Sequence, residues 1–190
     1  MGMKTLRHFL RFLVGYDGPE SQVTSRELDL LCSYAQGAET VCEIGCFEGK
    51  TTAALGQVAA GTVYTVDPFF RGRIGVCYSE IIAHLYCKRM GVTNVHFVRG
   101  FSSDVAPTFA VPIDFLFVDA DHRYEAIKQD WDAWVPKMRA GGIVALHDCK
   151  FAQNSPDPVG SFRFYETDIP MFSNVEEVAS VDSLVVLRIH

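Results

Sequence analysis

The sequence lacks the features that mark secreted, disulfide-bonded or membrane-spanning proteins. No apolar run approaches the length of a membrane span, and no signal peptide with a small-residue cleavage site is visible. No C-x-x-C pair occurs, and several cysteines lie in apolar patterns typical of reduced core thiols. The six cysteines are Cys32, Cys42, Cys46, Cys77, Cys87 and Cys149. Together these observations predict a cytoplasmic protein without a membrane span.

Blocks of positive charge are also missing. The net charge is −6, and no lysine- or arginine-rich block follows the first dozen residues. This balance argues against nucleic acid as the main substrate and favours a small-molecule one. With 190 residues and 48% hydrophobic content, the chain is large enough for one domain with a full core.

Short apolar or β-branched runs alternate with helical patterns along most of the chain. The expected strands are 40–44, 62–66, 94–98, 113–118 and 143–146, and the expected helices between them include 51–60, 76–90 and 123–138. A tight turn joins two further strands, 175–181 and 184–189, into an antiparallel hairpin. The alternation predicts an α/β fold of the Rossmann-like kind, a doubly wound, mostly parallel seven-stranded sheet with an antiparallel C-terminal hairpin.

Residues 1–36 are expected to form an N-terminal helical cap, and residues 37–190 one compact domain that holds the sheet. The segment 4–14 has the pattern of a short basic amphipathic helix. Such a helix touches a membrane surface, folds back over its own domain or packs on a partner chain. The last alternative would make the protein a homo-oligomer. A second helix begins near residue 25, with Thr24 or Ser25 as its cap.

A glycine loop follows the first strand, with the spacing Glu43-x-Gly45-x-x-x-Gly49. A strand that ends at Gly45 and restarts as a helix near Gly49 builds a backbone nest whose free amides point at a ligand. In the dinucleotide fingerprint a glycine lets the backbone touch a pyrophosphate, but Phe47 stands at that place here. The loop therefore favours a ligand that approaches by an amino-acid portion. An ordinary strand–helix turn is the simpler alternative.

Two later stretches add polar groups along the same sheet edge. Asp67 ends the second strand, about 20 residues past the glycine loop, where a carboxylate accepts hydrogen bonds from ribose hydroxyls. Its alternative is a strand-end residue that caps the next turn. Ser102 and Ser103 follow the third strand and either cap a short helix or contact an adenine edge.

Charged and imidazole side chains gather where the fourth and fifth strands end. Because ligands bind beyond the carboxyl ends of parallel strands, we expect these five residues to converge. They are Asp119, Asp121, His122, His147 and Asp148. The two carboxylates Asp119 and Asp148 suit Mg²⁺ or Mn²⁺, and His122 suits proton transfer near neutral pH.

From about residue 38 onward, the chain resembles the class I S-adenosylmethionine-dependent methyltransferases. The glycine loop, Asp67, the Gly-x-Ser-Ser-Asp stretch that begins at Gly100, a glycine-pair strand and the terminal hairpin follow in that order. Within the class, it is similar to the metal-dependent O-methyltransferases of the catechol, caffeoyl-CoA and macrolide-sugar kinds. Asp119, His122 and Asp148 match their pattern of an acid, a base three residues on, and an acidic pair at the end of the fifth strand.

The resemblance implies a binding site for S-adenosylmethionine (SAM) along these motifs. Asp67 would bind the ribose, and Ser102 and Ser103 would lie by the adenine. The residues implied to frame the methionine part are Glu43, Gly45, Cys46, Phe47 and Gly49.

The resemblance also implies O-methylation of a small-molecule hydroxyl. Asp119 and Asp148, with His147, would hold a divalent cation, and His122 would take the proton. One departure is that His147 stands where relatives have a carboxylate. Imidazole is a poor Mg²⁺ ligand, so the metal is softer, weakly held or absent.

Two other classes of function remain open. An NAD-dependent oxidoreductase uses the same sheet, although Phe47 and the C-terminal hairpin argue against it. A non-catalytic domain that binds a partner through its basic N-terminal helix is the second. An N-methyltransferase acting on nucleic acid is disfavoured, because the fourth strand ends in Asp119-Ala-Asp-His rather than an Asn-Pro-Pro-Tyr type stretch.

Overall fold

The computed structural model describes residues 3–72, 75–150 and 160–190. Its first half contains α1 (Met3–Leu13), α2 (Ser25–Ala35), β1 (Thr40–Ile44), α3 (Lys50–Val58), β2 (Thr62–Asp67), α4 (Tyr78–Arg89) and β3 (Val95–Arg99). Its second half contains α5 (Ser102–Val105), β4 (Ile113–Val118), α6 (Tyr124–Trp134), β5 (Met138–Leu146), α7 (Gly160–Thr167), β6 (Val175–Val181) and β7 (Leu184–Ile189). Short 3₁₀ turns lie at Ala106–Thr108, Val135–Lys137 and Ile169–Met171.

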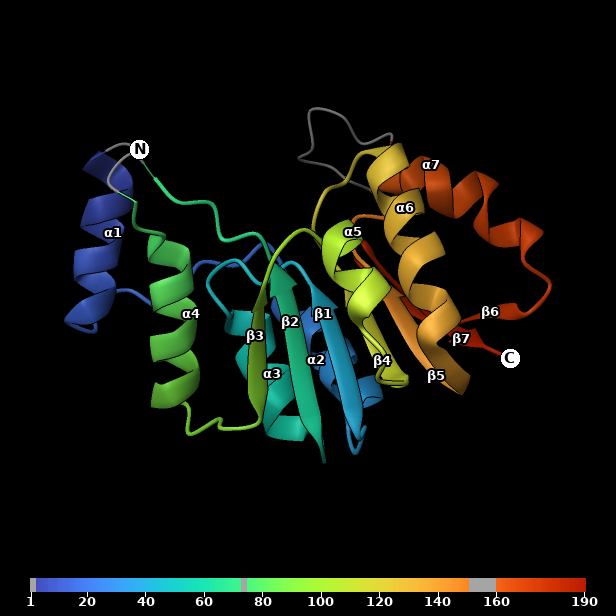
Figure 1. Ribbon diagram of the computed structural model, residues 1–190, viewed down its shortest axis with the longest axis horizontal. Coiled ribbons are helices and arrows are strands. Elements are labelled where there is room, and N and C mark those ends of the chain that lie inside the picture. Colours follow the sequence, from blue (N-terminus) through green and yellow to red (C-terminus); the bar gives the residue numbers. More distant parts are fainter. Residues whose placement is uncertain (1–2, 73–74, 151–159) are drawn as a thin grey trace.

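The strands form one sheet in the order β3-β2-β1-β4-β5-β7-β6 (Figure 1). The pairs from β3 to β5 are parallel, whereas β7 runs antiparallel to both β5 and β6. Ile44 pairs with Val66 and with Val118, which in turn pairs with Leu146, so four strands end at nearly the same level. This topology confirms the predicted doubly wound sheet with its antiparallel hairpin.

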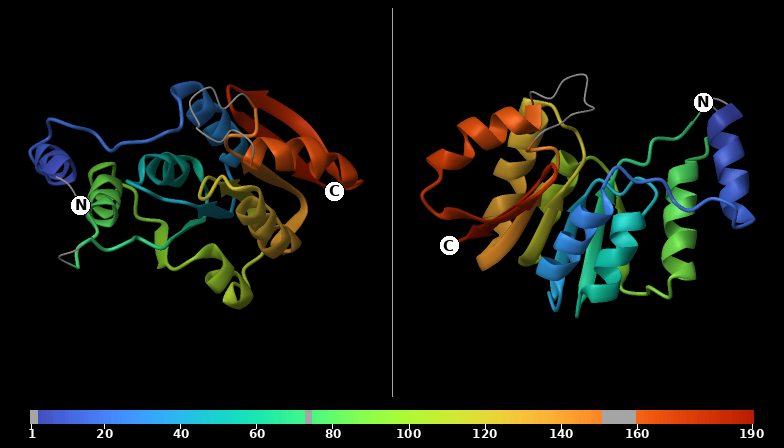
Figure 2. Two further views of the ribbon diagram at one scale, coloured as in Figure 1. Left: turned by 90° about the horizontal axis from the view of Figure 1, so that it is seen from above. Right: turned by 180° about the vertical axis from the view of Figure 1, so that it is seen from behind.

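Helices cover both faces of the sheet (Figure 2). On one face α5, α6 and α7 bury a cluster that includes Trp134 and Phe164. On the other face α2 and α3 bury a cluster that includes Leu31 and Leu55. The residues expected to form a cap thus lie in two places. Helix α2 packs on one face of the sheet, and α1 lies beside α4 at one end of the molecule.

The ends of two elements differ from the sequence expectation. The helix expected over 123–138 ends at Trp134, because Pro136 in the following 3₁₀ turn removes an amide donor and stops the helix. β5 therefore begins at Met138 rather than at Ile143. The short helix α7 has no counterpart in the sequence prediction.

Other local predictions are confirmed. The Thr24 hydroxyl accepts a hydrogen bond from the Glu27 amide at 3.2 Å, and the Glu27 carboxylate accepts one from the Thr24 amide at 2.8 Å. This reciprocal pair is a capping box. All six cysteines are free thiols. None of the helices in the described ranges has the length and apolar content needed to cross a membrane.

Gly45 follows β1 and packs against the backbone of Asp119, which follows β4. Its φ is +99°, and a Cβ atom there would stand 2.2 Å from the backbone oxygen of Asp119. Gly37 also has a positive φ, +78°, but a Cβ atom there would meet nothing within 4 Å.

We predict that Gly45→Ala lowers the free energy of unfolding by about 3 kcal/mol or more, because backbone strain and a clash add. The matched variant Gly37→Ala introduces backbone strain but no clash, and should lower the free energy of unfolding by about 1 kcal/mol. Urea denaturation of both variants measures the difference. Equal losses would show that the strand ends separate without cost.

Candidate functional site

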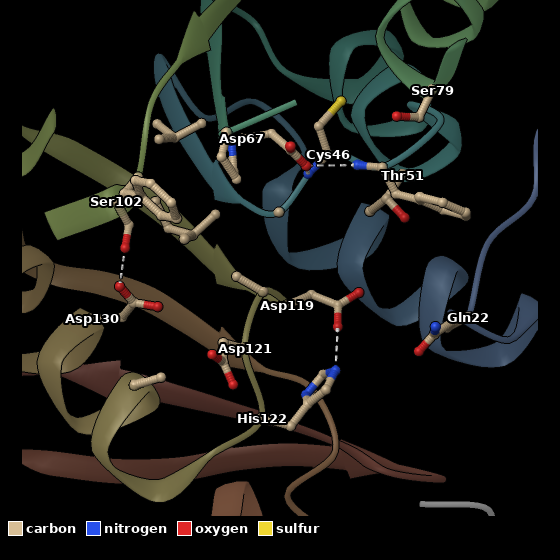
Figure 3. Close-up of a pocket in the computed structure, with 18 of the residues that line it drawn as sticks. Gln22, Cys46, Thr51, Asp67, Ser79, Ser102, Asp119, Asp121, His122 and Asp130 are labelled. Carbon is tan, nitrogen blue, oxygen red and sulfur yellow. Dashed lines mark hydrogen bonds and ion pairs between the residues drawn. The ribbon is translucent and has the colours of Figure 1, made fainter. Parts of the chain in front are cut away.

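A cavity of about 540 Å³ opens beyond the carboxyl ends of the central strands. Figure 3 shows the polar side chains that surround it. Its walls come from the segments after β1, β3 and β4, from the end of β2 and from α6. Of the residues singled out from the sequence, those that line it are Gly45, Cys46, Phe47, Asp67, Ser102, Ser103, Asp119, Asp121 and His122. A volume of this size is typical of small-molecule sites.

Two residues assigned to the cofactor lie behind this wall. Glu43 is fully buried in β1 and accepts hydrogen bonds from the hydroxyls of Thr52 at 2.5 Å and Thr65 at 2.7 Å. Burial raises the pKa of its carboxyl to about 8. Gly49 begins α3 against α4, where a Cβ atom would lie 2.8 Å from Cα of Ala83. Both residues therefore hold the two ends of the glycine loop in place without lining the cavity themselves.

Asp67 fastens the glycine loop. Its Oδ2 accepts hydrogen bonds from the amides of Cys46 at 2.9 Å and Phe47 at 3.0 Å, and its Oδ1 accepts one from Phe69 at 2.7 Å. The expectation of free loop amides is therefore wrong for Cys46 and Phe47, because the strand-end carboxylate occupies the nest. Phe47 takes a left-handed conformation, with φ +52°, to make this turn.

Ser102 does not cap α5, since Phe101 is the N-cap residue and no side chain caps the helix. Its hydroxyl instead donates a hydrogen bond to Oδ1 of Asp130 on α6 (Figure 3). Asp130 also lines the cavity, and sequence reasoning missed it. Its only sequence signal is an acidic residue amid the apolar face that carries Ile127, Trp131 and Trp134.

Four of the five strand-end residues converge. Nδ1 of the buried His147 lies 3.1 Å from Oδ1 of Asp119 and 3.6 Å from Oδ1 of Asp148. His122, which is about one third exposed, places Nδ1 3.5 Å from Asp148 and Nε2 4.0 Å from Asp119. Asp121 turns away and pairs with Arg123. A partly exposed imidazole and a buried one thus lie near each other, and both contact the carboxylates of Asp119 and Asp148.

His147 lies between carboxylates that favour its protonated form. Its Nε2 lies 3.3 Å from Oε2 of Glu27, which comes from α2 behind the sheet. Burial alone would lower the pKa of His147, but Asp119 and Glu27 outweigh it and raise the pKa to about 10. Burial alone would raise the pKa of Glu27, but His147, the Thr24 amide and Ser183 hold it well below its usual range.

The predicted metal ligands do not fit a cation in this arrangement. A histidine ligand offers a lone pair on one ring nitrogen. Both nitrogens of His147 face carboxylates at ion-pair distances, and Nδ1 has no well-aligned hydrogen bond among the described residues. A metal ion at Asp119, His147 and Asp148 would have to displace a proton from the ring. The metal stays a prediction.

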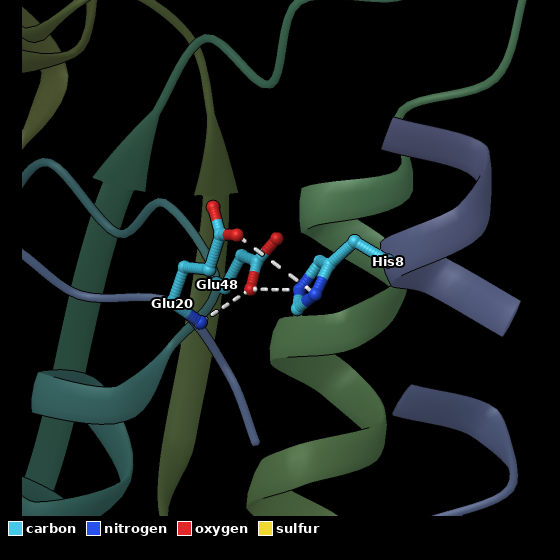
Figure 4. Close-up of side chains that lie close together, drawn as sticks. All are labelled: His8, Glu20 and Glu48. Atoms are coloured by element: carbon cyan, nitrogen blue, oxygen red, sulfur yellow. Dashed lines mark hydrogen bonds and ion pairs between the residues drawn. The ribbon is translucent and has the colours of Figure 1, made fainter. Parts of the chain in front are cut away.

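A second imidazole lies among carboxylates outside the cavity (Figure 4). Nε2 of His8 in α1 lies 3.0 Å from Oε2 of Glu48, and its Nδ1 lies 3.4 Å from Asp17 and 3.9 Å from Glu20. The same Glu48 oxygen accepts a hydrogen bond from the Glu20 amide. Because Glu48 belongs to the glycine loop and Glu20 lines the cavity, His8 braces two of its walls.

Comparison with known proteins places the chain in a family. The model of a family described as "Methyltransferase domain" matches residues 42–149, which is more than half of the chain. The chain therefore belongs to this family of methyltransferase domains. This membership confirms the family resemblance stated from the sequence.

Individual relatives are more distant. "Uncharacterized protein y4gI" of Sinorhizobium fredii is 29% identical over 127 residues, which cover 60% of this chain. The chain spans only 13% of that relative's length. The crystal structure of cofactor-bound Rv0187 from MTB gives a TM-score of 0.72 at 21% identity, over 99% of this chain and 90% of that one. An O-methyltransferase from Bacillus cereus in complex with SAH gives 0.70 at 20% identity, over 100% and 92%. These structural likenesses show a shared fold.

We predict that Glu27→Gln lowers the free energy of unfolding by about 3 kcal/mol near neutral pH, because it leaves a buried imidazolium without its partner. Because the pKa of His147 is raised, its contribution to the free energy of unfolding is fully present below about pH 6.5. This contribution is lost as the pH rises through about 10. The deficit of the variant should therefore shrink over that range.

Urea denaturation across this pH range, with chelator present, measures the effect. The matched control is Glu176→Gln, which breaks the exposed pair with His190 and should change stability little. A pH-independent deficit in Glu27→Gln would show that His147 is neutral.

Proposed function

We propose that this chain transfers a methyl group from SAM to a hydroxyl oxygen of a small molecule. One observation carries the proposal. The glycine loop with Asp67 and the strand-end cluster with Asp119 and His122 face the same cavity, although they lie far apart in the sequence. In a member of a methyltransferase family, this arrangement brings a cofactor wall and a proton acceptor together.

The charges of the cavity favour a cationic ligand. Among the described residues, the acidic side chains in its lining are Glu20, Asp67, Asp119, Asp121 and Asp130, and the lysine and arginine side chains are Lys50 and Arg123. When bound, SAM supplies a methyl group from a positively charged sulfur: the acceptor oxygen takes the methyl group, and the electron pair of the broken C–S bond stays on the sulfur. The same negative field disfavours a polyanionic acceptor such as nucleic acid.

His122 is the proposed base. It is the partly exposed imidazole at the cavity, whereas His147 is buried and already paired. Asp119 and Asp148 orient its ring at 4.0 and 3.5 Å and would stabilise the imidazolium that forms. Proximity of the hydroxyl to this ring, and removal of its proton, would supply most of the catalysis.

Exposed aromatic rings give the cavity a surface for planar groups. Phe47, Phe70 and Phe101 line it with 47%, 73% and 53% of their areas exposed. Phe70 and Phe101 pack edge to face, with ring centroids 5.7 Å apart. Such rings stack on planar ligands, which supports an adenine-bearing cofactor and a phenolic acceptor.

We predict that the chelator-treated protein binds S-adenosylhomocysteine (SAH) with micromolar affinity and does not bind NADH. Asp67→Ala should weaken SAH binding by more than about tenfold, because it removes the proposed ribose acceptor and loosens the glycine loop. Asp29→Ala, at an exposed site on α2 outside the cavity lining, is the control and should bind as wild type.

Isothermal calorimetry measures these affinities. Binding of NADH, or of neither ligand, would overturn the proposal. Repeating the titration with Mn²⁺ and with Mg²⁺ tests the metal expected from the sequence. A metal-dependent heat that is lost in Asp119→Ala would show that these residues hold a cation despite the protonated His147.

We predict that His122→Ala reduces turnover by about 10²- to 10⁴-fold, because proton removal is lost, while SAH affinity stays within about twofold. Release of SAH from SAM in the presence of phenolic and sugar acceptors measures turnover. The exposed His190→Ala is the control. A comparable loss of SAH binding in His122→Ala would assign the residue to the cofactor instead.

A further inference from the structure

Asp130 is an unexplained acidic group in the wall of the cavity. It projects from α6 and is only 5% exposed, yet it belongs to the lining. Burial raises the pKa of its carboxyl, although the bond from Ser102 opposes this shift. Keeping a carboxyl group in such a place costs stability unless hydrogen bonds satisfy both of its oxygens.

In the part of the chain that the structure describes, only one of its oxygens accepts a hydrogen bond. The Ser102 hydroxyl donates to Oδ1. Across residues 3–72, 75–150 and 160–190, no side chain or amide donates to Oδ2. Asp130 is a buried side chain that lines the cavity, and an oxygen of such a side chain without a donor in the protein points to a donor on the ligand.

The position of the pair indicates which part of the ligand is concerned. Under the proposed function, the amino-acid portion lies at the loop after β1 and the ribose lies at Asp67, at the end of β2. Ser102 follows β3, the next strand in the sheet. The adenine ring of the cofactor would therefore reach the segment that carries Ser102, with the exposed ring of Phe101 beside it.

The chemistry of the pair matches the amino edge of adenine. Because the Ser102 hydroxyl donates its hydrogen bond to Asp130, its oxygen can act only as an acceptor toward a ligand. Oδ2 of Asp130 is a second acceptor. The 6-amino group of adenine carries two N–H donors, whereas a 6-oxo purine presents an acceptor at the same place.

We propose that Asp130, oriented by Ser102, accepts a hydrogen bond from the 6-amino group of adenine and makes the site select 6-amino over 6-oxo purines. This assignment rests on the proposed function, since it takes the ligand to be SAM or SAH. Asp130 is thus a specificity-determining residue for the cofactor rather than a participant in methyl transfer.

The test compares SAH with S-inosylhomocysteine, in which a 6-oxo group replaces the amino group. Wild type should prefer SAH by about 100-fold, because the analogue sets its oxygen against two acceptors. Asp130→Asn presents an amide donor to that oxygen, and should bring the two affinities within about threefold or reverse their order. Calorimetry with each ligand measures the preference.

Two variants accompany the test. Asp132→Asn, at an exposed site on the same helix, should keep the wild-type preference. Ser102→Ala, which keeps the buried carboxyl but frees its orientation, should reduce the preference by about tenfold. Ser102→Ala also provides the readout if Asp130→Asn fails to fold.

Each outcome decides a different claim. Tight SAH binding with an unchanged preference in both Asp130→Asn and Ser102→Ala would overturn the role of Asp130 and leave the proposed function standing. Wild type that binds neither ligand would overturn the proposed function, and this assignment with it. A lost preference in Asp132→Asn as well would show a general charge effect, and would also reject the assignment.

Discussion

The close contact between Gly45 and the backbone of Asp119 sets the geometry on which the site depends. The two residues follow adjacent parallel strands, and a Cβ atom on Gly45 would stand 2.2 Å from the Asp119 carbonyl oxygen. Because the two strand ends lie close together, the glycine loop and the turn that leads to His122 line the same cavity. A glycine at this position thus lets the loop after β1 and the turn after β4 line the same cavity.

Buried charges then fix the side chains around that contact. His147 receives Glu27 from behind the sheet and Asp119 from the front. Ser183, in the turn of the C-terminal hairpin, donates both its amide and its hydroxyl to the same Glu27. One ion pair therefore links α2, the end of β5 and the hairpin, which gives the departure at His147 a structural explanation.

The fold could be predicted largely from the sequence because its signals are local. Apolar runs such as Ile113–Val118 mark buried strands, and Asp182 with Ser183 marks the hairpin turn. The rule that ligands bind at strand ends was enough to bring Asp119 and His122 together. The partners of the side chains could not be predicted. Glu27 lies 120 residues from His147, and Asp130 lies 28 from Ser102, and no periodicity encodes such pairs.

The contact between His8 and Glu48 links the start of the chain to the loop that lines the cavity. Glu48 lies in the glycine loop, and its carboxylate also holds the backbone of Glu20. Shortening the chain before residue 20, or fusing a bulky tag against α1, would therefore disturb the loop that lines the cavity. An affinity measured on such a shortened or tagged protein would describe a loosened loop rather than the intact one.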